Sequence, residues 1–135
     1  MSDKPIKYAA DRKYTTTHEW AKREGDLVVI GLSDYAQVQL GDIVYVELPA
    51  VGATVAAGKS FGTIESVKAA SDVFAPVSGT VEAVNAKVSE EAKIVNDDAL
   101  GEGWFVKIRP SNPAEFDQLL DAASYQQKIE AEEPH

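Results

Sequence analysis

The sequence predicts a mainly β fold in which two small antiparallel sheets pack together and short helices follow at the C-terminus. Short apolar runs recur through the chain, and glycine or proline separates them, as is typical of strands joined by tight turns. Beyond Pro110 the composition changes to one typical of helices. At 135 residues the chain fits one domain, with a core that needs neither disulfides nor metal.

Charge and composition argue against several classes of function. The chain has 22 acidic and 13 basic residues, and a net charge of −9 repels both nucleic-acid phosphates and anionic membrane surfaces. The sequence has no cysteine, no apolar run of transmembrane length and no signal-peptide pattern. We therefore expect no nucleic-acid or membrane partner and a cytoplasmic bacterial protein, or a mitochondrial matrix protein if the chain is a processed organellar form.

Two strands and a short helix are expected at the start of the domain. The β-branched and aromatic residues of 14–20 predict a strand, and residues 27–30 return after a glycine turn as the second strand of a hairpin. A helix is expected within residues 31–41, because Ser33 suits its N-terminal cap and Gly41 its C-terminal end.

The next strand is expected at residues 42–48, and a turn, a short strand and a second turn at residues 51–60. Apolar side chains alternate on both faces of residues 42–48, which predicts a strand with little exposed surface. One face carries Ile43 and Tyr45, and the other carries Val44, Val46 and Leu48.

The central stretch predicts a β-hairpin with a lysine at its tip. The apolar runs 61–64 and 73–77 predict the two strands, and the short polar connection between them predicts a tight turn. This turn would expose Lys68, which is followed by small side chains at Ala69, Ala70 and Ser71.

The remaining strands and a helical turn are expected downstream of the hairpin. Residues 80–84 and 104–108 predict strands, and residues 89–95 predict a helical turn between them.

Two helix starts are expected in the C-terminal segment. Asn112, with Pro113 at the first helical position and Glu115 shortly after, is typical of a helix N-terminus. Ser124 and Gln127 repeat the spacing of a capping box and predict a second start.

Motifs for catalysis by this chain alone are missing from the sequence. It contains no nucleophile elbow, no dinucleotide-binding glycine motif and no spacing typical of metal ligands. The adjacent carboxylates at 90–91 and 97–98 are interpreted as solvated charge, and His18 beside Glu19 as structural. We therefore expect no catalytic and no metal-binding residue, and a protein that is not an enzyme.

Lys68 is the candidate for chemistry. An exposed turn with small neighbours suits an enzyme that must grip the amine from outside in order to acylate it. Acylation neutralises the lysine and makes it the root of a long, largely apolar arm. Such a protein would carry a reactive group between active sites that belong to other proteins. The alternative interpretation is an ordinary solvated lysine.

The octapeptide Glu65-Ser-Val-Lys-Ala-Ala-Ser-Asp72 resembles the lipoyl-attachment motif of the glycine cleavage H-protein family. Biotinyl carriers typically have Met-Lys-Met at this hairpin, and lipoyl domains of 2-oxoacid dehydrogenases usually have Asp-Lys-Ala, whereas this chain has Val67-Lys68-Ala69. Further blocks resemble the family in its order: Thr17-His-Glu-Trp20, Gly31-Leu-Ser-Asp-Tyr-Ala36, Leu40-Gly-Asp-Ile-Val-Tyr-Val46, Leu48-Pro49, Ala75-Pro-Val-Ser-Gly79, Val95-Asn96 and Gly101-Glu-Gly-Trp104.

The resemblance implies a barrel-sandwich hybrid fold with lipoate attached covalently to Lys68. In the family the arm accepts an aminomethyl group at the pyridoxal-phosphate glycine decarboxylase (P-protein). It delivers that group to the aminomethyltransferase (T-protein), which passes the one-carbon unit to tetrahydrofolate and frees ammonia, and dihydrolipoamide dehydrogenase (L-protein) reoxidises the arm. The implied partners are these three proteins and the lipoylating enzymes, and the implied state is a monomer.

The resemblance also implies roles for other side chains. Glu65 and Gly52 match positions that help lipoylating enzymes recognise the domain. Thr17, Glu19 and Asp72 match polar positions of a cleft for the charged aminomethyl group, and an ammonium group in such a cleft needs anionic or hydrogen-bonding partners.

The expected domain organisation has four parts. Residues 1–13 form a loosely ordered N-terminal segment, residues 14–110 the lipoyl-carrier domain, residues 111–129 C-terminal helices packed on it, and residues 130–135 a solvated acidic tail.

Two alternatives to a glycine cleavage shuttle stay open. A relay protein would use the same lysine to supply lipoyl groups to other acceptors, and a non-catalytic binding module would never be modified at Lys68. The chain also departs from the family between Asn96 and Gly101, where Asp98-Ala-Leu100 replaces a common Pro-Tyr pair, so a different loop shape is expected there.

Overall fold

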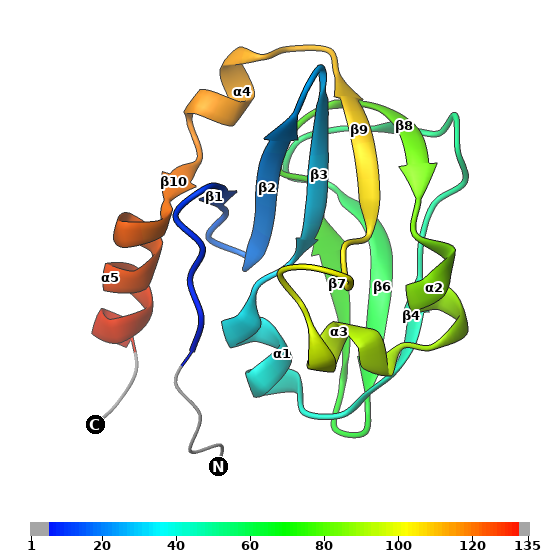
Figure 1. Cartoon of the computed structure of the whole chain (residues 1–135), viewed down its shortest axis with the longest axis vertical. Helices are drawn as coiled ribbons and strands as arrows, with labels where there is room; N and C mark the ends of the chain where they lie inside the picture. The colour runs from blue at the N-terminus through cyan, green and yellow to red at the C-terminus, as the bar shows by residue number, and fades with distance from the viewer. Residues whose placement is uncertain (1–5, 133–135) are drawn as a thin grey trace.

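The computed structural model describes residues 6–132 and contains two antiparallel sheets with short helices around them (Figure 1). The larger sheet has the strand order β10 (Leu120–Asp121), β1 (Lys13–Tyr14), β2 (Glu19–Glu24), β3 (Leu27–Leu32), β9 (Val106–Pro110), β8 (Gly79–Val84) and β5 (Thr54–Val55). The smaller sheet has the order β4 (Ile43–Glu47), β6 (Ser60–Ser66) and β7 (Ala70–Phe74). The helices are α1 (Asp34–Leu40), α2 (Ala86–Glu90), α3 (Lys93–Asp97), α4 (Ala114–Asp117) and α5 (Ala122–Glu132). The predicted mainly β architecture is confirmed.

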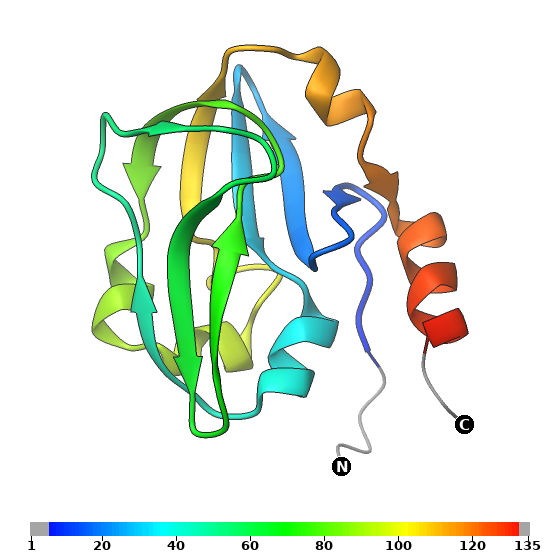
Figure 2. The same ribbon diagram turned by 180° about the vertical axis from the view of Figure 1, so that it is seen from behind.

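The main core lies between the two sheets. Its members alternate along each strand with side chains that face outward, as expected for sheets with one covered face. The smaller sheet contributes the buried side chains Val46, Ile64 and Val73, and the larger sheet contributes Ile30, Val81 and Ile108 among others. Figure 2 shows the smaller sheet from its outer side, with the tip of the β6–β7 hairpin at the same end of the molecule as α1. Within residues 6–132 no helix is long and apolar enough to cross a membrane.

A second, aromatic core lies where α5 packs against the start of the larger sheet. The rings of Tyr14 and Tyr125 stack with their centroids 4.5 Å apart, and Trp20 and Ile129 are buried beside them. The Tyr125 hydroxyl lies 2.8 Å from the Ser33 hydroxyl, and burial raises the pKa of Tyr125. The C-terminal helix is thereby joined to the loop before α1.

The expectation of one continuous strand over residues 14–20 is wrong. β1 ends at Tyr14 and β2 begins at Glu19, and between them His18 adopts a φ of 76°. The His18 N–H donates to the Thr15 carbonyl at 3.2 Å, and the Thr15 hydroxyl accepts from the Glu19 N–H at 3.1 Å. Threonine favours strands, but here the Thr15 hydroxyl gives the backbone a local hydrogen bond, and this turn replaces the predicted strand.

The expectation that residues 42–48 have little exposed surface is also wrong. The register between β4 and β6 shifts between Ile43 and Tyr45, so that Val44 is an extra residue in its strand. Such a β-bulge disturbs the alternation of faces. As a result Ile43 and Val46 are buried, whereas the adjacent side chains of Val44 and Tyr45 are 58% and 47% exposed.

The strand predicted at residues 104–108 and the helical turn predicted at residues 89–95 lie at different residues in the structure. The last core strand begins at Val106, two residues later than predicted, and it includes Pro110. Instead of one helical turn at 89–95, α2 begins at Ala86, and α3 follows it. The missed signal is Asn85, whose side chain accepts from the Lys87 N–H at 3.2 Å and caps α2.

The C-terminal helices begin at different residues from those predicted. Asn112 accepts from the Ala114 N–H at 3.2 Å, as its predicted role requires, but Glu115 binds the Ser78 N–H at 2.8 Å instead of its own helix. The capping box at Ser124 is wrong. Asp121 accepts from the Ser124 N–H at 2.7 Å, and α5 begins at Ala122.

Replacing Gly31 by alanine is expected to destabilise the protein. A Cβ atom at Gly31 would lie 2.6 Å from two ring carbons of Trp20, its cross-strand neighbour. Overpacking of this kind typically costs about 1–3 kcal/mol, measurable as the free energy of unfolding in urea. The double variant with Trp20→Phe lacks the clashing indole atoms and should lose less than the sum of the single losses. Strictly additive losses would contradict this account.

Candidate functional site

Lys68 lies exposed at the tip of the β6–β7 hairpin. The turn is closed by the Ser66 N–H, which donates to the Ala69 carbonyl at 2.8 Å. The Ser66 hydroxyl oxygen also accepts from the N–H groups of Lys68 and Ala69, each at 3.1 Å. Because one side chain satisfies both N–H groups, the backbone that bears Lys68 is held in a defined turn.

The connection between α1 and β4 is hydrogen-bonded to the hairpin tip. The Val67 N–H donates to the Asp42 carbonyl at 3.0 Å, and the Asn96 side chain donates to the Gly41 carbonyl at 3.0 Å. The Lys68 stem runs past Gly41, where a Cβ atom would meet its Cε at 3.6 Å. The backbone next to Lys68 is therefore hydrogen-bonded to the α1–β4 connection through Val67.

A buried carboxylate joins the two sheets at the other end of β7. Glu19 is only 1% exposed, and its Oε1 accepts from the hydroxyls of Thr15 at 2.6 Å and Thr17 at 2.5 Å. Its Oε2 accepts from the Phe74 N–H at 3.1 Å. Since Glu19 begins β2 and Phe74 ends β7, one side chain links the larger sheet to an edge strand of the smaller one.

Burial raises the pKa of the Glu19 carboxyl above its ordinary value of 4.5. The hydrogen bonds from Thr15, Thr17 and Phe74 favour the ionised form and oppose this shift, but desolvation is the larger effect.

A cavity of about 410 Å³ adjoins this carboxylate. Its lining is mainly apolar, with threonine hydroxyls included: Tyr14, Thr15, Thr16, Thr17, Gly58, Phe74, Ala75, Pro76, Gln118, Leu119 and Leu120. Alternate residues of a strand share a face, so Ala70, Asp72 and Phe74 form an outward row from the hairpin tip toward the cavity. The row from Ala70 to Phe74 is about 13 Å long at the usual strand rise.

The structure therefore gathers four of the predicted site residues along one path. Lys68 lies at its start, Asp72 along it, and Thr17 and Glu19 at its end, with Thr17 exposed in front of the buried Glu19.

The two residues predicted to guide lipoylating enzymes lie apart. Glu65 is exposed on β6 and pairs with Ala70 next to the tip. Gly52 lies in the turn after β4 with a φ of 94°, and its N–H donates to the Val81 carbonyl at 2.8 Å. Because β4 runs away from the hairpin tip, Gly52 lies beyond the opposite end of that strand.

Sequence reasoning missed three side chains that shape the site: Ser66, Thr15 and Asn96. Ser66 carries a weak signal, because serine at a hairpin turn often bonds to the backbone two residues on. Thr15 is two residues before Thr17 and four before Glu19, a spacing that a turn brings together. Asn96 gives no local signal, since its partner at Gly41 is distant in sequence.

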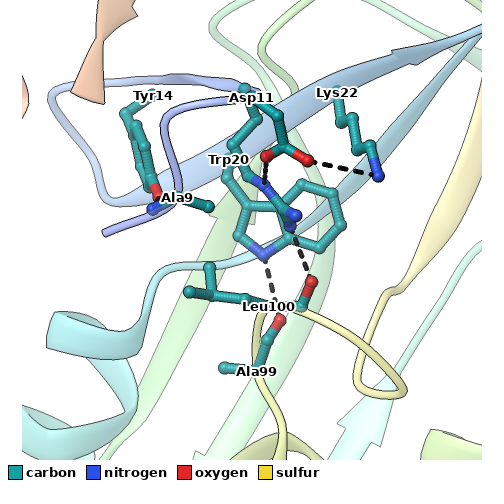
Figure 3. Close-up of polar contacts among 8 residues, drawn as sticks. Ala9, Asp11, Tyr14, Trp20, Lys22, Ala99 and Leu100 are labelled. Atoms are coloured by element: carbon teal, nitrogen blue, oxygen red, sulfur yellow. Dashed lines mark hydrogen bonds and ion pairs between the residues drawn. The ribbon is translucent and has the colours of Figure 1, made fainter. Parts of the chain in front are cut away.

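The loop that departs from the family pattern is fixed to β2 (Figure 3). The Trp20 indole N–H donates to the Ala99 carbonyl at 3.0 Å, and the Arg12 guanidinium donates to the Leu100 carbonyl at 2.6 Å. Arg12 also lies over the Trp20 ring at 4.5 Å and pairs with Asp11 at 2.9 Å. Backbone carbonyls make the contacts to Trp20 and Arg12, so these contacts do not require a Pro-Tyr pair.

The model of the family described as "Glycine cleavage H-protein" matches residues 12–132. The chain belongs to the glycine cleavage H-protein family. A glycine cleavage system H protein from Carboxydothermus hydrogenoformans is 52% identical over 122 residues, covering 90% of this chain and 94% of its own. One from Thermus thermophilus is 50% identical, with coverage of 90% and 95%. The crystal structure of such a protein from Mycobacterium marinum superimposes with a TM-score of 0.84 at 37% identity, covering 90% of this chain and 98% of its own.

Membership of the H-protein family confirms the predicted family and the predicted class of function. Glycine cleavage H-proteins are lipoyl carriers that shuttle between the other components of their system and are not enzymes themselves. The fold and the exposed hairpin lysine agree with that class.

The stability contribution of Glu19 is expected to fall as the pH rises. Its folded-state pKa lies above the unfolded value, so the folded protein binds this proton more tightly. The contribution is therefore fully present below pH 4.5 and is lost as the pH rises through the raised pKa. Urea unfolding of the wild type and Glu19→Gln across this range isolates the effect as a difference curve. If the wild type instead gains stability over Glu19→Gln as the pH rises, the hydrogen bonds from Thr15, Thr17 and Phe74 have a larger effect on the Glu19 pKa than burial.

Proposed function

We propose that Lys68 carries lipoate in amide linkage and that the protein shuttles an aminomethyl group from glycine decarboxylase to aminomethyltransferase. Dihydrolipoamide dehydrogenase is the proposed partner for reoxidation. The observation that carries the proposal is the exposed Lys68 on a turn held by Ser66, inside the attachment motif of the family.

The residues around Lys68 fit such a group. When bound, lipoate supplies a dithiolane that accepts the aminomethyl group and electrons. Lys68 provides an accessible amine, and Ala69 and Ala70 leave room for the modifying enzyme. The row of Ala70, Asp72 and Phe74 leads to an apolar cavity of about 410 Å³, which suits an uncharged arm.

Thr17, Glu19 and Asp72 are the proposed partners of the charged aminomethyl group. The Thr17 hydroxyl donates to Glu19 and lies 3.1 Å from the Thr15 hydroxyl, and its oxygen has a further lone pair that could accept a hydrogen bond from an ammonium group in the cavity. Glu19 adds negative charge directly behind that hydroxyl, and Asp72 adds an exposed carboxylate beside the approach. These residues would hold the group and exclude water from it between partners.

Lipoylating enzymes are the remaining proposed partners, with Glu65 and Gly52 as recognition positions. Glu65 lies on the exposed face beside the tip, where an enzyme acting on Lys68 would meet it. Gly52 adopts a positive φ that favours glycine, which suits a role through backbone shape. We also propose a cytoplasmic location, in keeping with the bacterial relatives reported above, and a monomer.

Protein incubated with lipoate, ATP and a lipoate–protein ligase is expected to gain the mass of one lipoyl group. Lys68→Arg keeps the charge but removes the acylated amine, so this variant should stay unmodified in intact-mass spectrometry. Lys59→Arg is the matched control, since Lys59 is an exposed lysine in a turn elsewhere and should leave the gain unchanged.

The outcomes separate the alternatives. A wild type that stays unmodified with an active ligase supports the binding module and overturns the carrier. A lipoylated protein that supports no glycine-dependent carbon dioxide release with the decarboxylase supports the lipoyl relay instead.

Glu19→Gln is expected to shorten the lifetime of the aminomethylated protein. The substitution keeps the size of the side chain but removes the negative charge behind the Thr17 hydroxyl that would bind the ammonium group. Charge-assisted hydrogen bonds contribute about 1.5–3 kcal/mol, so ammonia release without aminomethyltransferase should accelerate by roughly tenfold or more. Asp26→Asn, at an exposed turn of the β2–β3 hairpin, is the control and should not change the rate. Equal rates for the wild type and Glu19→Gln would remove Glu19 from the proposed cleft.

A further inference from the structure

We infer that an exposed apolar patch beside Lys68 is the docking surface for the enzyme that acylates this lysine. The hairpin patch consists of Val44, Tyr45 and Val67. The inference rests on the proposed function and names the surface through which that modification would occur.

The first observation is where exposed apolar side chains gather. Within residues 6–132 the large apolar side chains that are exposed are Val44, Tyr45, Val51 and Val67, at 58%, 47%, 64% and 67%. All but Val51 belong to the hairpin patch. Exposed apolar groups that cluster at one place are typical of interaction surfaces, whereas scattered ones need no explanation.

The second observation is the backbone feature that creates the patch. A regular β4 would turn either Val44 or Tyr45 toward the core, but the bulge between Ile43 and Tyr45 turns both outward. The bulge lies opposite Ser66, the residue that holds the lysine turn. The Val67 N–H bonds to the Asp42 carbonyl at 3.0 Å, which brings Val67 to the same end of β4.

The third observation is the charge around the patch. Asp42, Glu47, Glu65 and Asp72 are exposed on or beside the same outer face. In the segments 42–47 and 63–72 the only cationic side chain is Lys68 itself. The complementary partner surface therefore has an apolar centre and a basic rim.

The short length of a lysine side chain indicates which of the proposed partners contacts the hairpin patch: the acylating enzyme. That enzyme must bring its acyl donor to the amine of Lys68, so its surface has to cover the neighbouring Val67 and the bulge at Val44. A partner that receives the end of a long arm has no such need. Covering these two valines removes their apolar surface from water, which favours binding.

The test compares lipoylation rates of apo protein by a purified lipoate–protein ligase with lipoate and ATP. The variants are Val44→Thr, Val67→Thr and the double variant, because threonine keeps the β-branched shape and adds a hydroxyl. Ala131→Ser is the control: it also adds a hydroxyl at an exposed apolar position, but it lies in α5, away from the hairpin. Unfolding in urea checks that all variants fold alike, as expected for exposed positions.

The double variant is expected to lose about tenfold in kcat/KM, mainly through KM, while Ala131→Ser stays at the wild-type value. A double variant with wild-type kcat/KM overturns the docking surface but leaves the carrier function intact. A wild type that is never lipoylated instead overturns the proposed function itself. If the lipoylated double variant is impaired only in glycine-dependent decarboxylation, the patch belongs to the decarboxylase and the inference is wrong.

Discussion

One buried carboxylate, that of Glu19, links the two sheets beside the hairpin that carries Lys68. Glu19 receives hydrogen bonds from two threonines of its own turn and from the Phe74 N–H of the neighbouring sheet. Without an acceptor, the Phe74 N–H at the end of an edge strand would need another partner, and an unpaired carboxylate would be costly to bury. The Phe74 N–H and the Glu19 carboxylate thus satisfy each other's hydrogen-bonding requirement. The hairpin that carries Lys68 is aligned with the larger sheet at this point.

This arrangement separates rigid parts from reactive ones. The inner faces of both sheets are filled with branched apolar side chains, so the hairpin strands have a fixed support. Their outer face carries Lys68, Asp72 and the bulge at Val44, which are all accessible. A carrier whose arm visits several active sites needs this division, because the partners must meet the same surface each time.

Features encoded in neighbouring residues could be predicted from the sequence, and features that depend on distant partners could not. The hairpin around Lys68 and the Ser33 cap of α1 follow from local alternation and turn chemistry, and both are present. The bulge at Val44 breaks alternation without any glycine or proline to mark it. The burial of Glu19 depends on Phe74, 55 residues away. Patterns in neighbouring residues cannot predict such contacts between residues that are distant in sequence.

If Lys68 carries lipoate as proposed, the turn held by Ser66 would also affect how often the end of that arm meets the cavity beside Glu19. Ser66 and the bond from Val67 to Asp42 fix the backbone at the root of the arm. The volume that the free end samples is then set by the arm alone and not by a moving loop. A smaller volume means a higher effective concentration of the end at any site within reach. A stiff root would thus favour binding of the free end of such an arm in the cavity of its own protein.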